Sequence, residues 1–181
     1  WICPCWNSTP KPPPPPPTCS TTTTPFADNP LTHWHGNLLT ILRRQCILLV
    51  HDETRFPVFL PCMTKPDIGE LNDRFIDGFI NTLLKCGADD ALLDAAQAYM
   101  APLQADTSCS RTVQGTLNRM AFETEHMLHY QGVDVREITG NRVGAWLADT
   151  PWNIKGRGHV WPNKEMLALL AEGGQLRPVL H

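Results

Sequence analysis

The stretch RTVQGTLNRMAFETEHMLHY, residues 111–130, decides how the rest of this chain folds. Read at about 100° per residue, its apolar side chains fall on one side of a helix. That stripe consists of Val113, Leu117, Met120, Met127 and Leu128, with Thr124 among them. Ser108 or Ser110 can supply the N-cap oxygen, and Gly132 is a typical helix stop. A stripe of this length predicts a core helix against which other elements pack.

Two polar rows flank the apolar stripe. The first row contains Arg111, Gln114, Asn118, Glu125 and His129, with Phe122 among them. The second contains Thr112, Thr116, Arg119, Glu123, His126 and Tyr130. Such rows are usually solvated faces with weak pairs between residues four apart. An aromatic ring among polar side chains favours a binding site instead, if a second layer covers that side. Arg111, Gln114, Asn118 and Phe122 are therefore candidate binding residues.

Three short apolar runs precede this helix, at residues 38–42, 46–50 and 56–60. Polar residues separate them, which predicts a small antiparallel three-stranded meander over about residues 37–61. Pro57 cannot donate a ladder hydrogen bond, so the third strand is expected at a sheet edge. Arg43 and Arg44 in the first turn are candidate binding residues, although a charged turn that protects a sheet edge has the same pattern.

The remaining segments predict an α+β fold in which the meander packs against four to five helices. Besides the helix at 111–130, helices are expected at residues 67–86, 89–100, 134–148 and 162–171, with a loop at 150–161. Gly140 and Gly144 weaken the helix at 134–148, and Asp67 with Glu70 resembles a capping box for the helix at 67–86. We expect a single α+β domain over residues 31–175.

Residues 1–30 have a different composition, with six consecutive prolines at 12–17 and four threonines at 21–24. Such a segment cannot build a core, so we expect a disordered Pro/Thr-rich tail. The seven cysteines are odd in number and scattered, which favours free thiols in a reducing cytoplasm. No apolar run approaches the roughly 20 residues of a membrane span, so no membrane contact is expected.

The strongest catalytic pattern is Glu123-x-Glu125-His126-x-x-His129. Glu123 and His126 have the i,i+3 spacing of metal ligands in helical bundles. No second helix of this kind, no HExxH and no GxSxG pattern accompanies it. From the sequence we therefore assign no catalytic residue and predict no cofactor and no bound metal. A metal-dependent hydrolase or nuclease that uses Glu123, Glu125, His126 and His129 is the alternative.

Three blocks of sequence occur in an order that resembles a known family. They are HWHGNLL at 33–39 with RRQCILLV at 43–50 and FLP at 59–61, then RTVQGTLN at 111–118 with Ala121, Phe122 and Glu125, and finally Thr150-Pro151. The chain is similar in these blocks, over about residues 33–170, to small bacterial proteins classified only as a domain of unknown function. The resemblance implies a bacterial cytoplasmic protein, and it points to Arg111, Asn118 and Phe122 without giving them roles.

We predict a non-catalytic interaction or regulatory module that binds a protein partner. Arginine side chains hold carboxylates and phosphates through paired hydrogen bonds, so an acidic partner suits Arg43, Arg44 and Arg111. The net charge of −3 favours a protein over nucleic acid, whose affinity depends strongly on the number of cations.

Overall fold

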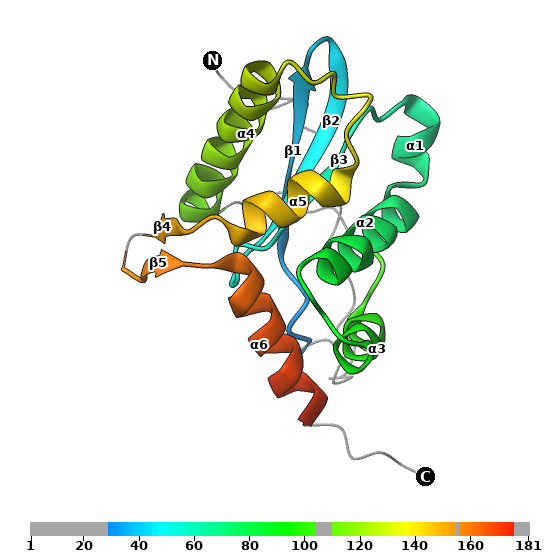
Figure 1. Ribbon diagram of the computed structural model, residues 1–181. Coiled ribbons are helices and arrows are strands. Elements are labelled where there is room, and N and C mark those ends of the chain that lie inside the picture. The colour runs from blue at the N-terminus through cyan, green and yellow to red at the C-terminus, as the bar shows by residue number, and fades with distance from the viewer. Residues whose placement is uncertain (1–28, 104–109, 155, 176–181) are drawn as a thin grey trace, which may run out of the picture.

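The computed structural model describes residues 29–103, 110–154 and 156–175, and it has an antiparallel sheet of three strands at its centre (Figure 1). The strands are β1 (Trp34–Ile41), β2 (Arg44–His51) and β3 (Pro57–Leu60), hydrogen-bonded in the order β1-β2-β3. The predicted meander is confirmed, and Pro57 lies in an edge strand as expected. Apart from Asn29 and Pro30, the predicted tail lies outside the described residues.

Helix α4 (Arg111–Gln131) covers one face of the sheet, as its apolar stripe predicts. Its buried residues are Val113, Leu117, Met120, Thr124 and Leu128. They pack against Cys46, Leu48 and Val50, which are alternate residues of β2. The helix ends at Gly132, which adopts the left-handed conformation with φ 62°.

The opposite face of the sheet packs against three other helices. These are α2 (Leu71–Lys85), α3 (Asp90–Tyr99) and α6 (Pro162–Gln175). Ile47 and Leu49 of β2 point into this second core, where the Phe75 and Phe79 rings of α2 also lie. Because β2 is buried on both faces from Cys46 onward, residues 46–50 form a continuous apolar run and do not alternate with polar residues.

Helix α5 (Gly140–Asp149) lies along the outer side of β3. The helix predicted over 134–148 starts only at Gly140, because Asp134 forms a local turn in which its carboxylate accepts the backbone N–H of Arg136 at 2.9 Å. Gly144 is buried in the middle of α5, where an added β-carbon would lie 2.9 Å from the Thr82 side chain of α2 and 3.4 Å from the carbonyl oxygen of Pro57 in β3. Glycine is therefore required at this position, although it weakens an isolated helix.

Two further predictions need correction. The single helix expected over 67–86 is two helices, α1 (Lys65–Gly69) and α2, with a break at Glu70. Its capping box is formed by Thr64 and Asp67, because Pro66 fits the first helical turn and moves the start upstream. The loop expected over 150–161 contains a hairpin of β4 (Trp152–Ile154) and β5 (Gly158–Val160), strands too short for a clear sequence pattern. The described residues thus contain six helices, and none is long and apolar enough to cross a membrane.

Candidate functional site

Three aromatic rings lie in a row on the exposed side of α4. Phe122, His126 and Tyr130 are four residues apart, so they share one line along the helix. The ring centroids of Phe122 and His126 are 6.2 Å apart, and those of His126 and Tyr130 are 6.4 Å apart, with interplanar angles of 23° and 11°. Phe122 is 65% exposed and Tyr130 is 85% exposed. We call this row the aromatic ladder.

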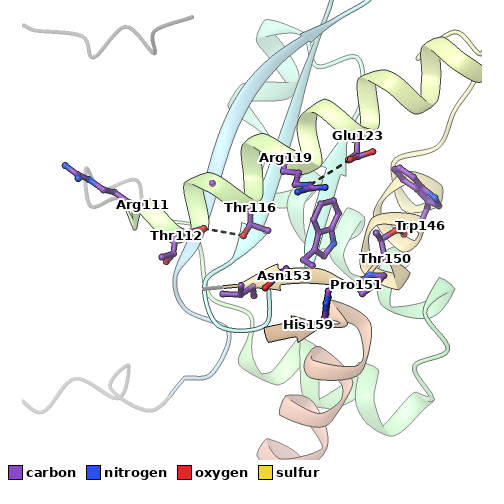
Figure 2. A pocket seen from close by; sticks show the side chains of 13 residues that line it. Arg111, Thr112, Thr116, Arg119, Glu123, Trp146, Thr150, Pro151, Asn153 and His159 are labelled. Atoms are coloured by element: carbon purple, nitrogen blue, oxygen red, sulfur yellow. Dashed lines mark hydrogen bonds and ion pairs between the residues drawn. The ribbon is translucent and has the colours of Figure 1, made fainter. Parts of the chain in front are cut away.

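A groove of about 480 Å³ runs beside α4, between this helix and the β4–β5 hairpin. We call it the α4–β4 groove, and Figure 2 shows its labelled residues. Its lining consists of Arg111, Thr112, Gly115, Thr116, Arg119 and Glu123 of α4, and of Trp146, Thr150, Pro151, Trp152, Asn153, Ile154 and His159. The groove therefore joins Arg111 and the second polar row of α4 to side chains of α5 and of the β4–β5 hairpin, which come later in the sequence.

Hydrogen bonds to the end of α5 fix the far wall of the groove. The indole nitrogen of Trp152 donates to the carbonyl of Leu147 at 2.9 Å, and the Thr150 hydroxyl donates to the carbonyl of Trp146 at 2.9 Å. Trp152 is buried by these contacts, whereas the Trp146 ring keeps 39% of its surface exposed. The groove thus offers an aromatic surface on a rigid support.

Two arginines and one carboxylate set the charge of the groove. The Arg119 guanidinium lies 3.9 Å from the Glu123 carboxylate, and both side chains are substantially exposed. An exposed pair at this distance contributes only about 0–1 kcal/mol, so Arg119 can exchange this partner for another carboxylate. Arg111 is also exposed, and in Figure 2 its side chain points away from the other labelled residues. This end of α4 therefore has an excess of positive charge.

The structure separates the binding residues that the sequence suggests along α4. Arg111 lines the groove, and Phe122 belongs to the aromatic ladder. The Gln114 amide nitrogen donates to the Asn118 amide oxygen at 3.4 Å, on the other side of the helix from the groove lining. Asn118 and Phe122 are exposed, so no second layer covers them within the described part of the chain.

Arg43 and Arg44 lie at the opposite end of α4 from Arg111. Together with Arg136, which follows that helix, they line a second pocket of about 330 Å³. Asp134 holds Arg136 through contacts of 2.6 to 3.1 Å. The hydrogen bonds from Arg136, with a smaller contribution from the charge of Arg44, lower the pKa of Asp134 to about 2. Since α4 has 21 residues and is about 30 Å long, the two arginine groups do not form one site.

The residues of the alternative metal site are not brought together with further ligands. Glu123 lies beside Arg119, and His126 stacks within the aromatic ladder. Glu125 and His129 are exposed. Across the ranges that the structure describes, no three His, Cys, Asp or Glu side chains form a group that could hold a metal ion.

Sequence reasoning missed the far wall of the groove, namely Trp146, Asn153 and His159. Asn153 and His159 lie in the hairpin that was expected to be a loop, and Trp146 lies in α5. Only the fold brings these three residues to α4. The alternation of buried Trp152, exposed Asn153 and buried Ile154 is the one local signal of a strand there.

Comparison with known protein families shows which family the chain resembles. The model of a family described as a domain of unknown function, DUF6933, matches residues 9–165, which is most of the chain. Neither the curated proteins nor the solved structures contain a match.

Proposed function

The chain belongs to the DUF6933 family of domains of unknown function, and from this starting point we propose that it is a non-catalytic interaction module that binds a protein partner along the exposed side of α4. The aromatic ladder carries this proposal. Phe122 and Tyr130 expose large apolar surfaces on a helix whose other face is fully occupied by the core. Exposed aromatic side chains that lie close together are typical of the anchoring residues of protein interfaces.

Charge indicates the chemistry of the partner. Arg111 and Arg119 lie at the groove end of α4, and the partly exposed Trp146 lines the same groove. A segment that places apolar side chains on the ladder and acidic side chains near these arginines would complement both features. Glu123 and Glu125 interrupt the positive charge along the same helix, which opposes a long row of phosphates and favours a protein over nucleic acid.

We further propose a cytoplasmic location in a bacterial cell. Cys46, Cys62 and Cys86 are free thiols in the described part of the chain. Free thiols are the usual state of cysteine in reducing compartments.

The test starts by finding the partner at the proposed surface. A photo-crosslinking residue replaces Phe122 in cells that express the protein, and mass spectrometry identifies the segment that is captured. That segment is then purified, and calorimetry measures its affinity for the wild type. We expect Phe122→Ala and Tyr130→Ala each to weaken binding about tenfold or more, because truncation of an anchoring aromatic costs at least about 1–2 kcal/mol.

Two further variants make this test specific. Arg119→Glu should weaken binding most at low salt, since screening removes the charge effect. Leu84→Ala changes a leucine of α2 that is 50% exposed, and it should leave the affinity unchanged. The proposal fails if the captured segment binds the Phe122 and Tyr130 variants as tightly as it binds the wild type.

A further inference from the structure

The two edges of the central sheet are protected very differently. The β3 edge contains Pro57 and is covered by α5, whose Gly140 and Gly144 let the helix backbone approach the strand closely. Strand β1 pairs with β2, and the described residues provide no strand beside its other edge. Its eight residues, WHGNLLTI, include no proline and no Asp, Glu, Lys or Arg. Proteins usually protect a free edge with such residues, and β1 lacks them.

The register identifies the backbone groups on the open edge. Leu42 and Arg43 have φ of 48° and 65° and form a two-residue hairpin turn, so Ile41 and Arg44 are the hydrogen-bonded pair beside it. Along β1, the N–H and C=O groups of successive residues point alternately toward β2 and away from it, so every second residue directs these groups to the open edge. These residues are Trp34, Gly36, Leu38 and Thr40. Leu38 is in the middle of the edge, and its side chain is 53% exposed.

Side chains of opposite charge lie at the two ends of the β1–β2 hairpin. Arg43 and Arg44 are at the turn end. Asp52 and Glu53 are at the other end, where the backbone N–H of Asp52 donates to the carbonyl of His33 at 2.9 Å. The Asp52 carboxylate is paired with the Arg55 guanidinium at 3.2 Å and lies 3.9 Å from the His35 ring of β1. Glu53 is therefore the carboxylate at this end that has no ion pair within the described residues.

We propose that β1 is the docking edge for a second copy of this chain, which pairs through its own β1 in antiparallel orientation with the two Leu38 residues opposite each other. This register places His33 of each copy opposite Arg43 of the other. The turn that carries Arg43 then lies about two strand spacings, roughly 10 Å, from Asp52 and Glu53 of the other copy. The long Arg43 and Glu53 side chains bridge this separation, and the twofold axis forms the contact twice.

Self-pairing suits this edge for two reasons. The strand carries no charge, so its copy brings no like charges to the centre of the interface. Antiparallel pairing also reverses the hairpin, which brings Arg43 of one copy toward Glu53 of the other. The docking edge is distinct from the aromatic ladder and the α4–β4 groove, so its test is independent of the proposed function.

The first experiment measures the mass of the full chain in solution by light scattering over a wide range of concentrations. We expect a dimer that dissociates on dilution. Leu38→Lys should yield a monomer with an unchanged circular dichroism spectrum, because two lysines would be opposite each other in the middle of the interface. Leu84→Lys alters an equally exposed leucine on α2 and should keep the dimer. A wild type that is monomeric throughout, or a dimer that Leu38→Lys leaves intact, overturns the proposal.

The second experiment exchanges the charges. Arg43→Glu and Glu53→Lys should each be monomeric alone, because every contact between the hairpin ends would then join like charges. An equal mixture should form a heterodimer, in which both contacts again join opposite charges. Failure of the mixture to associate more strongly than either variant alone contradicts the register. Binding of an unrelated extended peptide to a monomeric wild type would also overturn the assignment of a second copy.

Discussion

Gly140 of α5 lies directly against the carbonyl oxygen of Phe59 in β3, and the contact leaves no room for a β-carbon. One helical turn later, a β-carbon on Gly144 would lie 2.9 Å from the Thr82 methyl group of α2. These two glycines allow α5 to close the β3 edge and to pack on α2. Their low helix propensity is the cost of that contact.

We expect Gly140→Ala to lower the free energy of unfolding by about 2–3 kcal/mol, because the new methyl group must displace backbone. Gly115→Ala is the matched control in α4, where an added β-carbon has nothing within 4 Å. That variant should gain about 0.5–1 kcal/mol from helix propensity. Urea denaturation of both variants measures the difference, and equal effects would show that α5 does not approach β3 this closely.

His51 at the end of β2 is buried as a neutral imidazole. Its Nε2 lies 3.1 Å from the carbonyl oxygen of Thr32, so Nε2 carries the proton and donates. Nδ1 is then an acceptor for the hydroxyl and the backbone N–H of Thr54, at 2.9 and 3.3 Å. Desolvation by burial lowers the pKa of His51 to about 4, although the carbonyl of Thr32 and the charge of Asp52 oppose this shift.

This burial predicts a loss of stability in mild acid. The folded pKa is below the unfolded value of about 6.5, so the unfolded chain binds more protons between these two pH values. The contribution of neutral His51 to the free energy of unfolding is therefore fully present above about pH 6.5, and it is lost as the pH falls toward 4. We expect a loss of about 2 kcal/mol between pH 7 and pH 5. Urea denaturation at each pH checks this, and His51→Gln should remove that part of the pH dependence. A variant with the same profile as the wild type would assign the effect to other groups.

The elements that could be predicted are those whose pattern is local and long. The apolar stripe of α4 and the continuous apolar run of β2 identified the two central elements, because each has enough residues for its period to be seen. The β4–β5 hairpin was missed, since two strands of three residues give almost no period. The candidate site was only partly predictable for a related reason. Phe122 was assigned to one polar row and His126 and Tyr130 to the other, whereas the three rings meet over the exposed side between the rows.

The two sides of α4 should respond to truncation in opposite ways. Leu117 is buried against the sheet, so Leu117→Ala should cost about 2–5 kcal/mol of stability. Phe122 is largely exposed, and Phe122→Ala should change stability by no more than about 0.5 kcal/mol. Thermal and urea denaturation measure both values. A large loss for Phe122→Ala would mean that the ring packs within the folded chain and is not available to a partner.

Asp134 provides a test of the turn between α4 and α5. Hydrogen bonds from Arg136 are the main cause of its pKa of about 2. Arg136→Gln should raise the pKa of this carboxyl toward the ordinary value for Asp, because the charge-assisted hydrogen bonds are lost. Carbon NMR of the Asp134 carboxyl group over an acid titration measures the change. If the titration midpoint stays the same, then Arg136 does not hold the carboxylate in solution.

Metal content separates the proposed interaction module from the alternative hydrolase or nuclease. His126 is stacked between two rings and Glu123 lies beside Arg119, so a metal site would require both side chains to leave their present contacts. We expect the purified protein to bind no stoichiometric Zn, Mn or Fe by elemental analysis, and its melting temperature to be unchanged by EDTA. Stoichiometric metal that disappears in the His126→Ala variant, together with a lower melting temperature after chelation, would instead favour metal-dependent hydrolysis. It would also require α4 to exchange its aromatic ladder for a ligand set when the metal binds.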